Sequence, residues 1–132
     1  MRLVKRETDY AVRAICCMAG NKKDIVAVPE LVKCIGVPRP FLRKALQVLN
    51  KKGIVKSFKG VGGGFKLAKR PSEIFFLDIV EALQGPFKLS ECFFRKKICP
   101  KRSRCVLKKK LDAIENYVLS ELKAITIKDL LK

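Results

Sequence analysis

Three cysteines lie close together in the second half of the chain, at positions 92, 99 and 105. The stretch that contains them, CFFRKKICPKRSRC (residues 92–105), also carries six lysine or arginine residues and no acidic residue. Thiolates are ligands of iron–sulfur clusters and of zinc, and surrounding cations offset the negative charge of such a site. From this stretch alone, a metal site, a disulfide and a packing role all remain open.

The remaining chemistry is limited by the absence of histidine. Without histidine the chain cannot form Ser-His or Cys-His nucleophilic pairs, HExxH zinc sites or any His-ligated metal site. Six cysteines in a chain that begins without an apolar signal segment indicate reduced thiols or metal ligands rather than a disulfide framework. We interpret Cys16, Cys17 and Cys34 as packing residues, because free cysteine behaves as a small hydrophobe.

The formal net charge is +18 in 132 residues. Residues 1–70 hold 17 basic and 4 acidic side chains, and residues 71–132 hold 13 and 8. Such a surplus indicates a polyanionic partner, either nucleic acid or an anionic membrane surface. A lysine-rich proteome would raise glutamate as well, and acidic residues are scarce here, so we favour nucleic acid. No apolar run approaches the roughly 20 residues of a membrane span, and we expect a cytoplasmic protein without a membrane partner.

The order of expected elements predicts a mainly helical fold with a small β-wing. Apolar periodicity predicts helices over residues 8–19, with Thr8 as a candidate cap, and over residues 29–35. A third helix lies within residues 37–53, where Pro40 suits a helix start and Gly53 a helix end. Two alternating stretches, 54–58 and 65–69, predict strands joined by the glycine-rich KGVGGG. This order is typical of a winged helix-turn-helix.

The second half of the sequence predicts a helix over residues 74–85, a cysteine-rich loop, a long helix and a short C-terminal helix. The long helix carries an apolar seam suited to pairing with a second copy, formed by Leu107, Leu111, Ile114, Val118, Leu122 and Ile125. We therefore divide the chain into a DNA-binding domain (1–85), a cysteine loop (86–105) and a dimerisation region (106–132).

The third helix and the wing are the candidate DNA-contacting elements. Arg39, Arg43 and Lys44 suit guanine edges or phosphates, and Gln47 suits adenine. The glycine run does not match GxGxxG, because Phe65 stands at the last glycine position. We expect a tight hairpin that brings the backbone near a phosphate, with contacts from Lys59, Gly62 and Gly63. A purely structural turn is the alternative.

Four stretches of the sequence together resemble the Rrf2 family of bacterial transcription regulators. They are DYAVRA, GVPRPFLRKALQVLNKKGIVKS, KGVGGGFKLAKRP and the three-cysteine loop before a long helix. The resemblance covers nearly the whole chain. It implies a homodimeric winged-helix repressor or activator whose dimer helices cross and, in many members, an iron–sulfur cluster bound by three loop cysteines.

The resemblance implies that Cys92, Cys99 and Cys105 are the cluster ligands. Six residues separate the first two, where cluster-binding members usually have five, and Lys108 stands where some members have a ligating histidine. A protonated lysine has no lone pair to offer. Other members use a carboxylate from the partner's first helix, which corresponds to Asp9 here.

Alternatives to that fourth ligand remain. Asp9 can instead be a helix N-terminal carboxylate, and Glu91 is a second candidate ligand beside Cys92. A related redox-sensing type uses a histidine where this chain has Arg13. Cys-x6-Cys-x5-Cys lacks the close Cys-x2-Cys pair of most structural zinc sites, so we place zinc behind a cluster.

The function expected from these features is that of a regulator, not an enzyme. We predict a homodimer that binds a palindromic DNA operator under the control of a [2Fe-2S] or [4Fe-4S] cluster, as a repressor with a redox-sensing role. The alternative is a cluster-free relative controlled by a partner protein, a small ligand or thiol oxidation.

Overall fold

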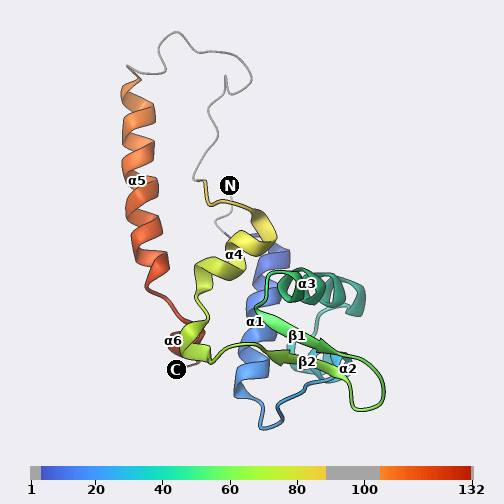
Figure 1. Ribbon diagram of the computed structural model, residues 1–132. Coiled ribbons are helices and arrows are strands. Elements are labelled where there is room, and N and C mark those ends of the chain that lie inside the picture. The colour runs from blue at the N-terminus through green and yellow to red at the C-terminus, as the bar shows by residue number, and fades with distance from the viewer. Residues whose placement is uncertain (1–3, 89–104, 132) are drawn as a thin grey trace.

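A computed structural model of the chain describes residues 4–88 and 105–131. Figure 1 shows α1 to α4 and a two-stranded hairpin gathered in one body, with α5 standing apart from it and α6 returning to it. In chain order the elements are α1 (Arg6–Gly20), α2 (Val28–Ile35), α3 (Arg39–Lys51), β1 (Val55–Phe58), β2 (Gly64–Leu67), the 3-10 turn η1 (Pro71–Glu73), α4 (Phe76–Gln84), α5 (Val106–Lys123) and α6 (Ile127–Leu130). The expected mainly helical fold with a β-wing is confirmed.

One apolar core joins the first three helices to the wing. Its buried side chains come from every element of the winged helix-turn-helix, among them Ile15, Leu31, Leu42, Leu46, Leu49, Val55 and Phe65. Pro29 and Pro40 occupy the first turns of α2 and α3, as expected. Gly36 ends α2 in the left-handed conformation (φ 66°), which a residue without a Cβ adopts freely.

The start of α1 differs from the sequence-based expectation. The helix begins at Arg6, and Thr8 lies inside it with its side chain fully buried rather than acting as a cap. The Thr8 hydroxyl has no hydrogen-bond partner among residues 4–88 and 105–131. Instead, the backbone N–H of Lys5 donates to Gln84 Oε1 at 2.7 Å. Packing of the first turn against the body therefore outweighs the capping propensity of threonine.

The wing is an antiparallel pair of strands extended by a third short segment. Val55 pairs with Leu67 and Phe58 with Gly64 in register. Val26, in the α1–α2 connection, exchanges two backbone hydrogen bonds of 2.9 Å with Phe65. This additional pairing, which the sequence pattern did not predict, ties the wing to the helix-turn-helix.

The C-terminal segment returns to the body. Helix α5 ends at Lys123, so Ile125 lies beyond it and not in the helical seam. The backbone N–H of Ile127 donates to the carbonyl of Ile74 at 2.9 Å, and the Ile127 side chain is fully buried in the common core. The C-terminal end of the α5–α6 region is thus placed by the body, although α5 itself buries no residue. Among the described helices, none is long and apolar enough to cross a membrane.

Two of the cysteines interpreted as packing residues form a disulfide. Cys17 of α1 is bonded to Cys34 of α2, with their Cα atoms 6.7 Å apart. The interpretation of these two as reduced thiols is therefore wrong, because the packing of α1 on α2 brings positions distant in sequence together. Cys16 is a free thiol that packs against the core, as predicted.

We predict that Gly64→Ala destabilises the wing. A Cβ at Gly64 would overlap the backbone of Val26, whose carbonyl accepts from Phe65. The free energy of unfolding in urea should fall by about 1–3 kcal/mol. Gly20→Ala is the matched control, since a Cβ there meets open space at a helical position and should stabilise by up to about 1 kcal/mol. Equal urea midpoints for the two variants would contradict the packing described.

Candidate nucleic-acid interface and cysteine site

Helix α3 presents one buried and one polar face. The buried stripe consists of Leu42, Ala45, Leu46 and Leu49. With this stripe fixed in the core, the predicted contact residues lie outside it, and all of them are exposed: Arg39, Arg43, Lys44 and Gln47. At 3.6 residues per turn, Lys44 and Gln47 lie opposite the stripe, and Arg39 and Arg43 flank it.

The predicted contact cations of α3 have no carboxylate partner among the described residues. Among the described residues, no ion pair involves Arg39, Arg43 or Lys44. A face whose charges are not neutralised within the chain attracts a polyanion such as a phosphate backbone. The helix also begins directly after the turn that follows Gly36, so its N-terminal end is accessible.

The geometry of the turn itself accounts for the glycines of the wing. The Gly63 N–H donates to the Gly60 carbonyl at 3.0 Å, and a Cβ at Gly63 would overlap the Phe58 carbonyl. Gly62 has φ 78° and open space around it. These observations establish the tight turn, and Lys59 beside it is exposed. DNA contact by Lys59, Gly62 and Gly63 stays a prediction.

Two exposed apolar side chains were missed from the sequence. Phe41, on the first turn of α3, is 54% exposed, and Val61 at the tip of the wing is fully exposed. Both fall outside the buried apolar pattern: Phe41 lies beside the stripe that begins at Leu42, and Val61 lies between glycines. The sequence signal that could have indicated their exposure is an apolar residue within a basic stretch.

Of the three loop cysteines, the structure describes Cys105 alone. It is a free, half-buried thiol at the N-cap of α5. Cys92, Cys99 and the candidate Glu91 lie outside the described residues. Lys108, where a histidine ligand was considered, donates to Asp112 at 2.8 Å and so serves an ion pair within α5. No group of three potential metal ligands occurs within residues 4–88 and 105–131.

Asp9 lies in the first turn of α1. Its carboxylate forms an ion pair with Arg13 at 3.0 Å, and the Asp9 side chain is 47% exposed. Glu7 is a second acidic residue of the same turn, a position that the helix dipole favours. Asp9 is therefore accessible to a second subunit, and ligation would require it to exchange Arg13 for a metal.

Comparison with known proteins identifies the family. The family model described as Rrf2, iron-dependent transcriptional regulator, matches residues 4–132. The chain belongs to the Rrf2 family. Protein aau3 of Rhizobium meliloti is 37% identical over 133 residues, covering 100% of this chain and 86% of that protein. The HTH-type transcriptional regulator NsrR of Oceanobacillus iheyensis is 31% identical over 132 residues, covering 98% and 89%.

A solved structure shows the same fold. CymR, the global cysteine regulator of B. subtilis, superposes with a TM-score of 0.82 at 22% identity, covering 99% of this chain and 97% of that one. The Rrf2 chain is thus a transcriptional regulator of the winged-helix class, which binds DNA, and not an enzyme. The individual DNA contacts and the cluster ligands remain predictions.

The Cys16 thiol should be distinguishable from a reactive or ligating thiol by its pH dependence. Burial raises its pKa above the ordinary value, so less thiolate is present at any given pH. In the folded, reduced Rrf2 protein, alkylation of Cys16 by iodoacetamide should rise at higher pH than alkylation of glutathione in the same tube. In urea the two profiles should coincide. Coinciding profiles in the folded protein would contradict the burial of Cys16.

Proposed function

We propose that this Rrf2 protein is a homodimeric regulator whose binding to a palindromic operator is controlled by an iron–sulfur cluster on Cys92, Cys99 and Cys105. The observation that supports it most is the position of the cysteine segment. It connects α4, which packs against α1 and α3, to α5, which carries the exposed apolar residues. A change at the cysteines therefore acts on both the DNA-contacting helix and the dimer helix.

The DNA contacts follow from the exposed face of α3. Arg39 and Arg43 donate to guanine edges or phosphates, Lys44 contacts phosphate, and Gln47 pairs with adenine. Phe41 supplies an apolar contact for a thymine methyl group. Lys59 and the backbone at Gly62 and Gly63 approach an adjacent phosphate, since glycine lets a backbone come close.

The dimer is supported by the exposed apolar side chains of α5. Leu107 is 65% exposed, Tyr117 67% and Ile114 49%. Exposed apolar residues recurring along one helix are typical of an interface, because their burial against a second copy removes them from water. Two winged domains joined in this way match a palindromic operator through their two-fold symmetry.

The residues present fit a cluster in two respects. Cys105 is a free thiol at the N-terminus of an 18-residue helix, where the helix dipole favours the negative charge of a thiolate-ligated cluster. The basic side chains between Cys92 and Cys105 offset the same charge. Asp9 of the partner subunit is the proposed fourth ligand. When bound, the cluster would supply oxidation and exchange chemistry, and a hard oxygen ligand beside three thiolates makes it labile.

Control of DNA binding by the cluster is a coupling free energy between two sites. Residues 86–105 span the interval between α4 and α5, so a cluster bound there restricts the position of α5 relative to the body. In a dimer this sets the spacing of the two α3 helices. Loss or modification of the cluster relaxes that restriction and changes operator affinity.

Arg43→Ala should weaken operator binding by about tenfold, and Lys44→Ala should lower the salt slope of log K by about 1. Operators selected from a random-sequence duplex library serve as the probe, with fluorescence anisotropy at several salt concentrations. Lys128→Ala is the control, since Lys128 is an exposed cation on α6, away from α3 (Figure 1). An equal loss in all three variants would assign the effect to net charge and contradict the proposed face.

Cys99→Ala should abolish visible absorbance after anaerobic purification and change operator affinity. Asp9→Asn should still assemble a cluster but lose it faster, because a neutral amide is a poorer ligand than a carboxylate. Cys16→Ala is the matched control and should retain absorbance. The sensing claim fails if Cys99→Ala binds and responds like the wild type, and the assignment of Asp9 fails if cluster lifetime is unchanged.

A further inference from the structure

A second pair of cysteines, separate from the loop, lies within the helix-turn-helix. Cys17 of α1 and Cys34 of α2 are bonded, and the proposed cluster function uses neither. Cys34 is exposed, whereas Cys17 is half-buried and packs against the core. The pair therefore has one sulfur accessible to small molecules and one held in place by the body.

The fold itself holds the two thiols together. Helices α1 and α2 pack against each other, and each buries an apolar side chain in the common core, Ile15 and Leu31. In the reduced protein the two sulfurs remain neighbours at high effective concentration, which favours closing of the bond. Cys16, next in sequence, competes less, since burial raises its pKa and lowers the fraction of thiolate.

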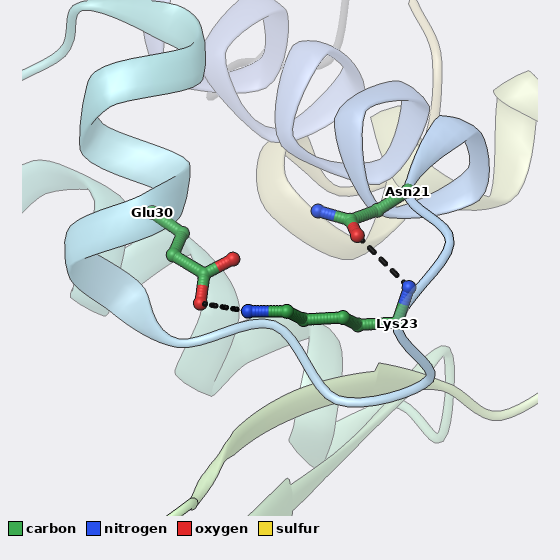
Figure 2. Close-up of polar contacts among 3 residues, drawn as sticks. All are labelled: Asn21, Lys23 and Glu30. Carbon is green, nitrogen blue, oxygen red and sulfur yellow. Dashed lines mark hydrogen bonds and ion pairs between the residues drawn. The ribbon is translucent and has the colours of Figure 1, made fainter.

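Two polar contacts hold the α1–α2 connection in addition to the disulfide. In the α1–α2 connection the Lys23 N–H donates to Asn21 Oδ1 at 2.9 Å, and Lys23 Nζ pairs with Glu30 Oε1 at 3.3 Å (Figure 2). The ion pair is largely exposed and contributes little. The buried side chains of Val28 and Leu31 hold α2 in the core, so we expect opening of the disulfide to loosen α2 without unfolding it.

The disulfide lies close to the DNA-contacting helix in the chain. Cys34 is the residue before Ile35, the last residue of α2, and α3 begins at Arg39. We propose that Cys17 and Cys34 are a reversible thiol modification site, and that closing their disulfide tightens DNA binding by fixing the end of α2 ahead of α3. The DNA part of this inference rests on the proposed function, whereas the modification site does not.

A low-molecular-weight disulfide of the glutathione class is the proposed oxidant. The exposed Cys34 thiolate attacks it, forms a mixed disulfide and releases one small thiol. The Cys17 thiolate then attacks the Cys34 sulfur, the mixed disulfide breaks, and a second small thiol leaves. The protein loses two protons and two electrons in total, and the small disulfide is reduced to two thiols. Excess small thiol reverses both exchanges.

The pre-organised form binds more tightly because less freedom is lost on binding. Closing a loop of this length also restricts the unfolded chain. We expect the oxidised protein to bind operator about three- to tenfold more tightly, and to unfold on the order of 10 °C higher.

The experiment equilibrates the protein anaerobically in buffers of varied oxidised-to-reduced glutathione ratio. A Cys92→Ser, Cys99→Ser, Cys105→Ser triple variant removes the loop thiols from the readout. Peptide mapping follows the Cys17–Cys34 linked peptide, and anisotropy follows operator affinity. The amount of linked peptide and the operator affinity should change over the same range of glutathione ratios. With Cys34→Ser added, both responses should vanish, and with Cys16→Ala added, both should persist.

Absence of the linked peptide at every ratio would overturn the modification site. A linked peptide without any change in affinity would overturn the effect on DNA binding and leave a purely structural disulfide. Failure of the proposed cluster function is distinguishable, because it appears in the wild type as missing iron, sulfide and absorbance, while the triple variant reports on Cys17 and Cys34 alone.

Discussion

The burial of one face of α3 is the constraint on which the rest of the structure depends. Leu42, Leu46 and Leu49 lie fully buried in the core shared with α1, so the helix cannot rotate without exposing them. Arg43 and Lys44 consequently point away from the core. The wing has the same origin, because Val55 and Phe65 enter that core and anchor the two strands on it. The proposed DNA-contacting surface is thus the outer side of the helix that this packing fixes.

Features set by local sequence could be predicted. The apolar spacing of α3, Pro40 in its first turn and Gly53 after its end mark one helix, since periodicity, proline and glycine act over a few residues. The same spacing placed Lys44 and Gln47 opposite the apolar stripe with Arg43 flanking it, and the structure has all three exposed. The resemblance to the Rrf2 family predicted the overall fold correctly.

Features set by distant contacts could not be predicted in this way. Pairing of Val26 with Phe65 and of Ile74 with Ile127 joins segments far apart in sequence, and no local pattern encodes either. The Cys17–Cys34 disulfide was misinterpreted for the same reason, because it depends on how α1 packs against α2. The cluster ligands remain predictions, because Cys92 and Cys99 lie outside the described residues and Asp9 would act across a dimer.

The proposed switch is a labile cluster on the segment between α4 and α5, and its gain or loss changes the positions of both helices. The most direct test is operator affinity measured anaerobically on one preparation before and after cluster removal by a chelator, with iron and sulfide counted in each state. The account predicts iron and sulfide in the first state, neither in the second, and a change in affinity of about tenfold or more. Equal affinity in the two states, or no iron and sulfide at the outset, would contradict it.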